Sequence, residues 1–202
     1  MPAKLPTAFF QRPDVLTIAR ELLGKHLYTR IDGVVTAGRI VETEAYRHEG
    51  DQSMTMHLQR KGHQAQGLYV PGGHAYIYTV YSRHALFNIA CHDADHPDTV
   101  LIRAIEPLVG VAEMMRRRGL EKPGRNLTAG PGVLSQALGI TPTLSGALVT
   151  GPEIWFEDHG EIVAETEVVA SARVGLAYAG AEAAGLPWRF RVEESKWTSP
   201  AK

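Results

Sequence analysis

The sequence has only one cysteine, Cys91, and almost no net charge. A single cysteine excludes an intrachain disulfide and a zinc site built on several thiolates. With 21 basic and 22 acidic residues the formal net charge is -1, whereas nucleic-acid-binding proteins usually carry a basic excess. Any surface that binds DNA must therefore be a local patch.

Long hydrophobic runs are also missing. No stretch approaches the roughly 20 apolar residues of a membrane span, and Met1 to Phe10 lacks the apolar run and cleavage site of a signal peptide. We therefore predict a cytoplasmic or nucleoid-associated protein without a membrane partner. The 202 residues are 44% hydrophobic, which is enough to bury one substantial core. We therefore expect a single domain over residues 1–202.

The local patterns predict a mixed α/β domain with several antiparallel strands. Asp14 is a suitable N-cap for a helix that Gly24 ends, and further helices are expected near 111–118 and 131–138. Strands are expected at 26–29, 34–44, 75–81, 85–91, 100–105, 154–156, 167–171 and 189–192, with residues 82–84 as a turn. Residues 46–67 are polar and lack a clear period, which indicates a long loop, either functional or disordered.

Two groups of residues suggest chemistry. Glu44 ends the strand expected in Arg39–Tyr46, which reads RIVETEAY; taken alone, this stretch favours an exposed glutamate at a sheet edge. Tyr76, Tyr78 and Tyr81 share another strand, and Asn88 lies on its return strand. Tyrosines usually pack in cores, but flat aromatic faces also hold extruded bases, with stacking of about 1–3 kcal/mol per base.

These stretches recur together with others in a fixed order along the chain. They are RIVETEAY, PGGHAYIYTVY at 71–81, Asn88, VLIRAIEP at 100–107, NLTAGPG at 126–132 and SARVGL at 171–176. Together they resemble the alkyladenine (3-methyladenine) DNA glycosylase family over about residues 8–192, which we take as the core between short tails. The resemblance implies a curved, largely antiparallel sheet with peripheral helices and a protruding β-hairpin, similar to the formyltransferase C-terminal-domain-like fold.

The resemblance also implies the catalytic groups. Glu44 matches the general base that activates water for attack on C1′ of a flipped nucleotide. Arg103 and the main chain of Val174 match the groups that help hold this water. The carboxylate also suits the positive charge that develops on the sugar as the N-glycosidic bond breaks.

Other matched positions imply how the base is handled. Tyr46 and Tyr78 match aromatic faces that enclose the flipped base, and Asn88 matches a side chain that keeps out the exocyclic amine of guanine. Tyr81 matches the wedge that fills the vacated stack, beside Arg83 and His84 at the hairpin tip.

The implied activity is monofunctional hydrolysis of alkylated purines from DNA. The substrates expected are 3-methyladenine and, further, 7-methylguanine, hypoxanthine and ethenoadenine, with an abasic site left for base excision repair. No lysine stands at a matched pocket position, which argues against a Schiff-base mechanism. The expected partners are water and the minor groove of damaged double-stranded DNA, bound by a monomer without cofactor or metal.

The sequence departs from the family at three places. A histidine usual on the pocket wall falls, without gaps, on Thr55; a two-residue slip would select His57, but the gap-free spacing favours Thr55. We therefore expect a changed lesion range, with neutral purines most affected. The hairpin tip, Ser82 to His84, is more polar than usual, and Val133 stands where a lysine is frequent, which predicts modest, salt-sensitive DNA affinity.

Three other hypotheses remain open. His92, Asp93, Asp95 and His96 form a candidate metal site, although such residues are common in turns. A non-catalytic nucleic-acid-binding module on the same scaffold has no reason to present Glu44 to a negatively charged ligand. Glycoside hydrolysis of a carbohydrate or free nucleoside usually requires paired carboxylates, and Glu42 is a poor partner for Glu44.

Overall fold

One antiparallel sheet forms the centre of the fold. In the computed structural model, which describes residues 2–200, nine strands join this sheet in the order β1-β7-β2-β3-β6-β5-β4, with β9 paired to β3 and β8 to β9. Their bounds are β1 Ala3–Lys4, β2 His26–Ile31, β3 Val34–Tyr46, β4 Ala75–Val80, β5 His84–Cys91, β6 Asp98–Val109, β7 Ile154–Asp158, β8 Val168–Ser171 and β9 Arg189–Val192. The prediction of a mixed α/β fold with a largely antiparallel sheet is confirmed.

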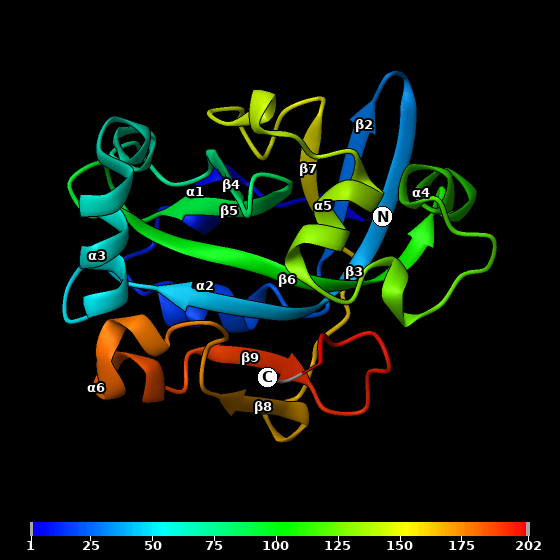
Figure 1. Ribbon diagram of the computed structural model, residues 1–202. Helices are drawn as coiled ribbons and strands as arrows, with labels where there is room; N and C mark the ends of the chain where they lie inside the picture. Colours follow the sequence, from blue (N-terminus) through cyan, green and yellow to red (C-terminus); the bar gives the residue numbers. More distant parts are fainter. Residues whose placement is uncertain (1, 201–202) are drawn as a thin grey trace.

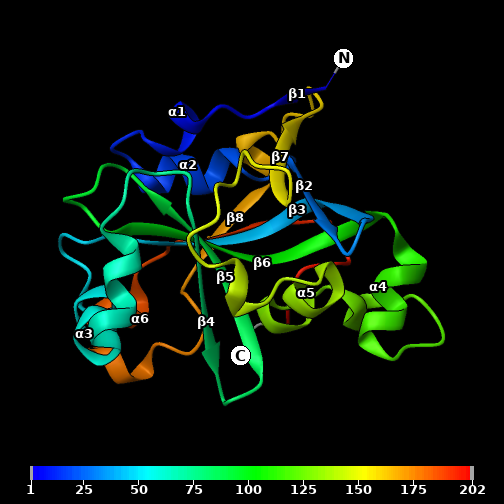
Figure 2. The ribbon, with the colours of Figure 1, turned by 90° about the horizontal axis from the view of Figure 1, so that it is seen from above.

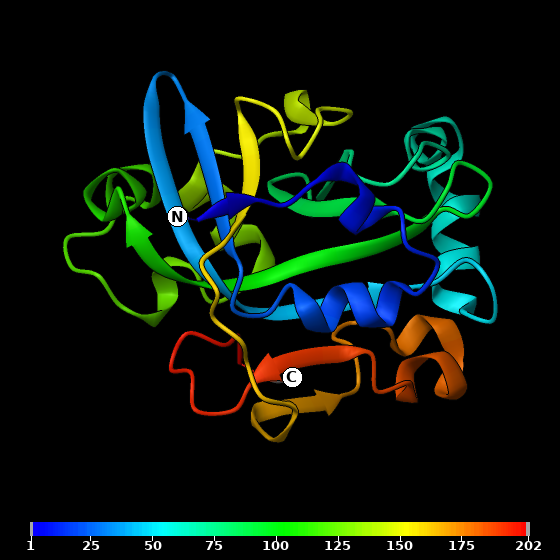
Figure 3. The same cartoon turned by 180° about the vertical axis from the view of Figure 1, so that it is seen from behind.

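The helices lie around this sheet. They are α1 Thr7–Phe10, α2 Val15–Glu21, α3 Gln52–Lys61, α4 Val111–Arg118, α5 Pro131–Leu138 and α6 Gly180–Gly185, with short 3₁₀ turns between them. Figure 1 shows α3 and α6 together at one end of the sheet and α4 at the other. Figure 3 shows α2 on the face of the sheet that is turned away from the viewer in Figure 1. Among the helices of residues 2–200, none is long and apolar enough to cross a membrane.

The expected first helix forms for the predicted reason. The carboxylate of Asp14 accepts hydrogen bonds from the main-chain N–H groups of Leu16 and Thr17, which have no partner inside the helix. Helix α2 buries Val15, Ile18 and Ala19. The hydroxyl of Thr43 donates to the carbonyl of Ala19, so α2 is fixed against β3.

Strand β3 runs through the middle of the sheet. Its last part pairs with β6 on one side and with β9 on the other, where Glu42, Thr43 and Glu44 lie opposite Arg191, Phe190 and Arg189. Register shifts on both sides of Glu42 interrupt the pairing with β6, and such bulges re-aim side chains. Glu44 is fully buried, so an exposed position at a sheet edge, favoured by this stretch alone, is wrong.

The predicted hairpin is present, but its turn is at residues 81–83, one residue earlier than expected, so Tyr81 lies in the turn and His84 begins β5. Strands β4 and β5 are paired along their length, from Ala75 opposite Ile89 to Val80 opposite His84. The tip of this hairpin projects away from the rest of the sheet (Figure 2). At the tip, Tyr81 and Ser82 have φ angles of 50° and 55°, the left-handed conformation of the two central residues in a primed hairpin turn. The Tyr81 side chain is 88% exposed, so the hairpin presents an aromatic ring to solvent.

The expected loop at 46–67 is wrong, because most of it is helical. Helix α3 is capped by Asp51, whose carboxylate accepts from the N–H of Ser53. The 3₁₀ segment Gly62–Leu68 follows, and Met54 and Leu68 pack with Tyr76 in a small second core. This helix is stabilised by docking against distant residues rather than by its own apolar stripe, so periodicity does not reveal it.

Candidate active site

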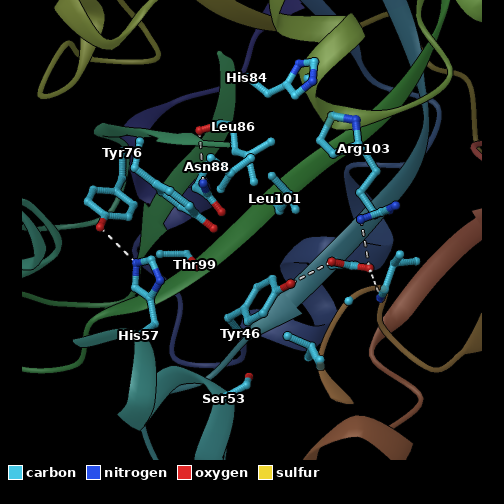
Figure 4. A pocket seen from close by; sticks show the side chains of 18 of the residues that line it. Tyr46, Ser53, His57, Tyr76, His84, Leu86, Asn88, Thr99, Leu101 and Arg103 are labelled. Atoms are coloured by element: carbon cyan, nitrogen blue, oxygen red, sulfur yellow. Dashed lines mark hydrogen bonds and ion pairs between the residues drawn. The ribbon is translucent and has the colours of Figure 1, made fainter. Parts of the chain in front are cut away.

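A cavity of about 680 Å³ lies between helix α3, the β4–β5 hairpin and the loop that contains Val174. Strand β6 forms its floor with Thr99, Leu101 and Arg103, and the start of α5 closes another side. Figure 4 shows the side chains that converge on it. Of the sequence-predicted residues, the cavity brings together Glu44, Tyr46, Tyr78, Tyr81, His84, Asn88, Arg103 and Val174.

Two hydrogen-bond donors and one guanidinium hold the Glu44 carboxylate. Its Oε1 accepts from the main-chain N–H of Val174 at 2.8 Å and faces Nη1 of Arg103 at 3.1 Å. Its Oε2 accepts from the hydroxyl of Tyr46 at 2.7 Å (Figure 4). Burial, followed by the charge of Glu44, raises the pKa of Tyr46 well above its ordinary value, so this hydroxyl keeps its proton and remains a donor.

Aromatic side chains form the wall opposite. The Tyr76 and Tyr78 rings lie 5.5 Å apart, and the Tyr78 ring lies 4.8 Å from that of His57. Nε2 of His57 is 2.9 Å from the hydroxyl of Tyr76. The Lys61 ammonium lies 4.7 Å from the centre of the Tyr78 ring. The wall therefore offers flat faces for a ring-shaped ligand, with one cation nearby.

The structure places His57, not Thr55, on this wall. Helix α3 lines the cavity with Ser53, Met54, His57, Arg60 and Lys61, which recur at helical spacing on one face. Thr55 points to another side of the helix, where its hydroxyl lies 3.4 Å from the carbonyl of Asp51. His57 is the residue that the two-residue slip would have selected, and Tyr76 belongs to the aromatic group noted in the sequence. Lys61 was missed, and only a helical period across 53–61 would have indicated it.

A buried ion pair connects α3 to the Glu44 site. Arg173 donates to both carboxylate oxygens of Asp51, at 2.5 and 2.9 Å, and to the carbonyls of Ala45 and Ala183. Both side chains are 0% exposed. Burial would raise the pKa of Asp51, but hydrogen bonds from Arg173 and Ser53 outweigh it and the pKa is lowered. Because Arg173 precedes Val174, this pair fixes the N–H that contacts Glu44.

Of the other predicted residues, Asn88 and His84 line the cavity from the hairpin, whereas Thr55 and Arg83 do not line it. Asn88 is buried on the hairpin, with its Nδ2 3.3 Å from the carbonyl of Leu86. At the tip, Nε of exposed Arg83 donates to Nε2 of His84 at 3.1 Å. His84 packs against Gly132, where an added Cβ would lie 3.0 Å from the imidazole, so this glycine permits close approach of α5 to the hairpin.

The histidine-rich turn after β5 lies apart from the cavity. His92, Asp93 and His96 place one potential ligand atom each within 4.8 Å of one another, and Asp95 does not belong to this group. Nδ1 of His92 already accepts the main-chain N–H of Asp93, while Oδ1 of Asp93 accepts from the N–H groups of Asp95 and His96. Local turn hydrogen bonds therefore account for this arrangement.

The state of His57 yields a test by pH. Burial, with a smaller effect of Lys61, lowers the pKa of His57 from 6.5 to about 4. Between these two pH values the unfolded chain binds a proton at His57 that the folded chain does not. The contribution of neutral His57 to the free energy of unfolding is therefore fully present above pH 6.5 and is lost as the pH falls toward 4. Each pKa unit corresponds to about 1.4 kcal/mol, so this group contributes at most about 3 kcal/mol to the loss.

Urea unfolding at pH 7 and pH 4.5 measures this loss. His57→Gln is expected to lose less stability than the wild type on acidification, whereas the exposed control His63→Gln should match the wild type. Equal losses in all three proteins would contradict a half-buried, neutral His57.

Comparison with known proteins identifies the family of this chain. A family model described as Methylpurine-DNA glycosylase matches residues 8–196. A protein of Chlamydia felis named "Putative 3-methyladenine DNA glycosylase" is 41% identical over 193 residues, covering 95% of this chain and 97% of the relative. Similarly named proteins of Shouchella clausii and Chlorobaculum parvum are 39% and 40% identical, over 92% and 98% of this chain and 90% and 92% of the relatives. The chain therefore belongs to the methylpurine-DNA glycosylase family.

Proposed function

We propose that this DNA glycosylase hydrolyses the N-glycosidic bond of alkylated purines in double-stranded DNA and leaves an abasic site. One observation carries the proposal: a fully buried carboxylate, that of Glu44, is held by two donors and the Arg103 guanidinium in a cavity walled by tyrosines. A volume of about 680 Å³ falls in the usual range of small-molecule sites and accommodates a flipped purine nucleotide.

Glu44 acts as the general base. A carboxylate has about four lone-pair positions. Val174 and Tyr46 donate to two of them, and Arg103 forms an ion pair with Oε1. A remaining position can accept a hydrogen bond from the attacking water. As the water oxygen bonds to C1′, its proton passes to Glu44, and the electron pair of the C1′–N bond leaves with the purine. The carboxylate also stabilises the positive charge that builds up on the sugar.

The cavity walls select the base. Tyr46 and Tyr78 enclose the flipped purine, and buried Asn88 crowds the exocyclic amine of guanine. An N-alkylated purine already carries a positive charge, so it leaves without a strong acid. Exposed Tyr81 fills the gap in the duplex from the minor-groove side, while Arg83 and His84 contact the DNA beside it. A monomer is sufficient for this contact.

Duplexes carrying one modified purine test the proposal. After incubation with the protein, alkali should cut the strand at the modified position, because abasic sites are alkali-labile. Strand cleavage before alkali treatment would contradict a monofunctional enzyme. Binding without alkali-labile sites would instead indicate the non-catalytic module.

The lesion range depends on His57 in this arrangement. Thr55 was expected at the base-contacting wall, but the cavity geometry favours His57, so an imidazole remains available to neutral purines. His57→Ala is expected to slow excision of hypoxanthine about tenfold, the value of one hydrogen bond of roughly 1.4 kcal/mol. Excision of 3-methyladenine should change much less, because this base leaves easily.

Single-turnover excision of the two lesions checks this difference. Thr55→Ala is the matched control on the same helix and should leave the ratio of the two rates unchanged. If His57→Ala slows both lesions equally, or Thr55→Ala changes the ratio, the assignment of this wall to His57 fails.

A further inference from the structure

A second carboxylate lies directly behind the Glu44 site. Glu42 is fully buried, and its Oε1 accepts from Nε of Arg103 and from Nε of Arg189, each at 2.7 Å. Arg103 thus spans two carboxylates, because its Nη1 faces Glu44 at 3.1 Å. The four side chains form a charge-balanced group with two anions and two cations.

The C-terminal segment completes this group. Ser199 is 4% exposed, and both its main-chain N–H and its hydroxyl donate to Glu42. The same hydroxyl oxygen accepts from Nη2 of Arg103 at 3.2 Å and from Nη2 of Arg189 at 3.4 Å. One donor and two acceptor positions are all that a hydroxyl has, so Ser199 is fully used in joining these three side chains.

Arg125, from outside this segment, holds it in place. We call residues 195–199 the C-terminal strap. Arg125 donates twice to the carbonyl of Thr198, at 2.8 and 2.6 Å, and the hydroxyl of Ser195 accepts from the N–H of Trp197. Ser199 lies beyond the residues 8–196 that match the family model. A segment distant in sequence is therefore clamped against the group that contacts Glu44.

We infer that Glu42 and Ser199 are positioning residues, which hold the Arg103 guanidinium in the orientation that directs Nη1 at Glu44. This inference rests on the proposed role of Glu44. Charge alone leaves Arg103 free to pair symmetrically with either carboxylate, whereas fixed contacts at Nε and Nη2 leave only Nη1 for Glu44. The pKa of Glu42 agrees with this arrangement: burial would raise it, but Arg103 and Ser199 hold it below its ordinary value.

Single-turnover excision with enzyme in excess separates positioning from folding. A partly unfolded variant needs more protein to saturate the DNA but reacts with the same rate constant once saturated. Misplacement of a catalytic group by about 1 Å can lower a rate about 100-fold. Ser199→Ala removes only one of the contacts that hold Arg103, so we expect it to lower this rate constant about tenfold, with unchanged affinity for the damaged duplex. Glu42→Gln should lower it about 100-fold for the same reason.

Ser195→Ala is the matched control, because it removes the same hydroxyl from the same strap without a contact to Glu42. It should react at the wild-type rate. The inference is overturned if Ser199→Ala also reacts at the wild-type rate, or if both serine variants slow the reaction equally.

Guanidinium NMR keeps the test independent of activity. The Nε–H of Arg103 should exchange slowly with solvent in the wild type and in Ser195→Ala, and faster in Ser199→Ala. If the wild type excises no base, the proposed function fails, while this signal still reports the role of Ser199. Unchanged exchange in Ser199→Ala would then overturn the positioning role.

Discussion

Glu44→Gln is expected to lower the single-turnover rate of base excision by about 1,000-fold, within the range attributed to general-base catalysis. Glutamine has nearly the same size, but its amide cannot take a proton from water at neutral pH. Its Oε1 can still accept from Val174 and Arg103, and its NH₂ can donate to the oxygen of Tyr46, which now accepts. The loss is therefore chemical and not a loss of shape.

Two measurements separate this loss from unfolding. The variant should bind a duplex containing a modified purine about as well as the wild type, and its melting temperature should show that the domain remains folded. Glu49→Gln, a matched change at an exposed glutamate beyond the end of β3, should retain full activity. Excision by Glu44→Gln at the wild-type rate would remove the proposed mechanism.

Arg173→Met is expected to lower the free energy of unfolding by about 3–5 kcal/mol, as for other buried ion pairs that lose one partner. The substitution leaves Asp51 as an uncompensated charge in a position that is 0% exposed. It also removes the donors to the carbonyls of Ala45 and Ala183. Because Asp51 caps α3, helix α3 should loosen, and with it the wall that carries His57.

Urea denaturation at neutral pH measures this effect. Arg116→Met is the matched control, because Arg116 pairs with Glu113 while 73% exposed, and such a surface pair is worth less than about 1 kcal/mol. The double variant Arg173→Met with Asp51→Asn should recover part of the loss, since asparagine still caps a helix but carries no charge. A loss no larger than that of the control would show that the pair does not hold α3.

The sequence alone determined the features that depend on neighbouring residues. Apolar and aromatic runs indicated most of β3 to β6, Asp14 marked the start of α2, and the hairpin turn was placed within one residue of its observed position at 81–83. These predictions succeed because strand pattern, capping and turn conformation act within a few residues. The spacing of short motifs also selected the family, and with it the residues that converge on the cavity.

Three features of the site depended on residues far apart in the chain. Helix α3 has no strong period of its own and is fixed by Asp51 and Arg173, which are 122 positions apart. The phase of that helix, not the count of residues from Asp51, turns His57 toward the cavity and Thr55 away from it. Glu42 was expected to be a poor catalytic partner for Glu44, yet Ser199, 157 residues later, links it to Arg103.

One physical reason separates the features that the sequence determines from those that only the tertiary structure decides. Local structure follows from backbone and capping preferences that short stretches carry themselves, so they can be recognised from the sequence. Buried charges are tolerated only where folding supplies partners. Both glutamates of RIVETEAY are therefore visible in the sequence, but only the tertiary structure decides that Glu44 faces the cavity while Glu42 holds the arginine behind it.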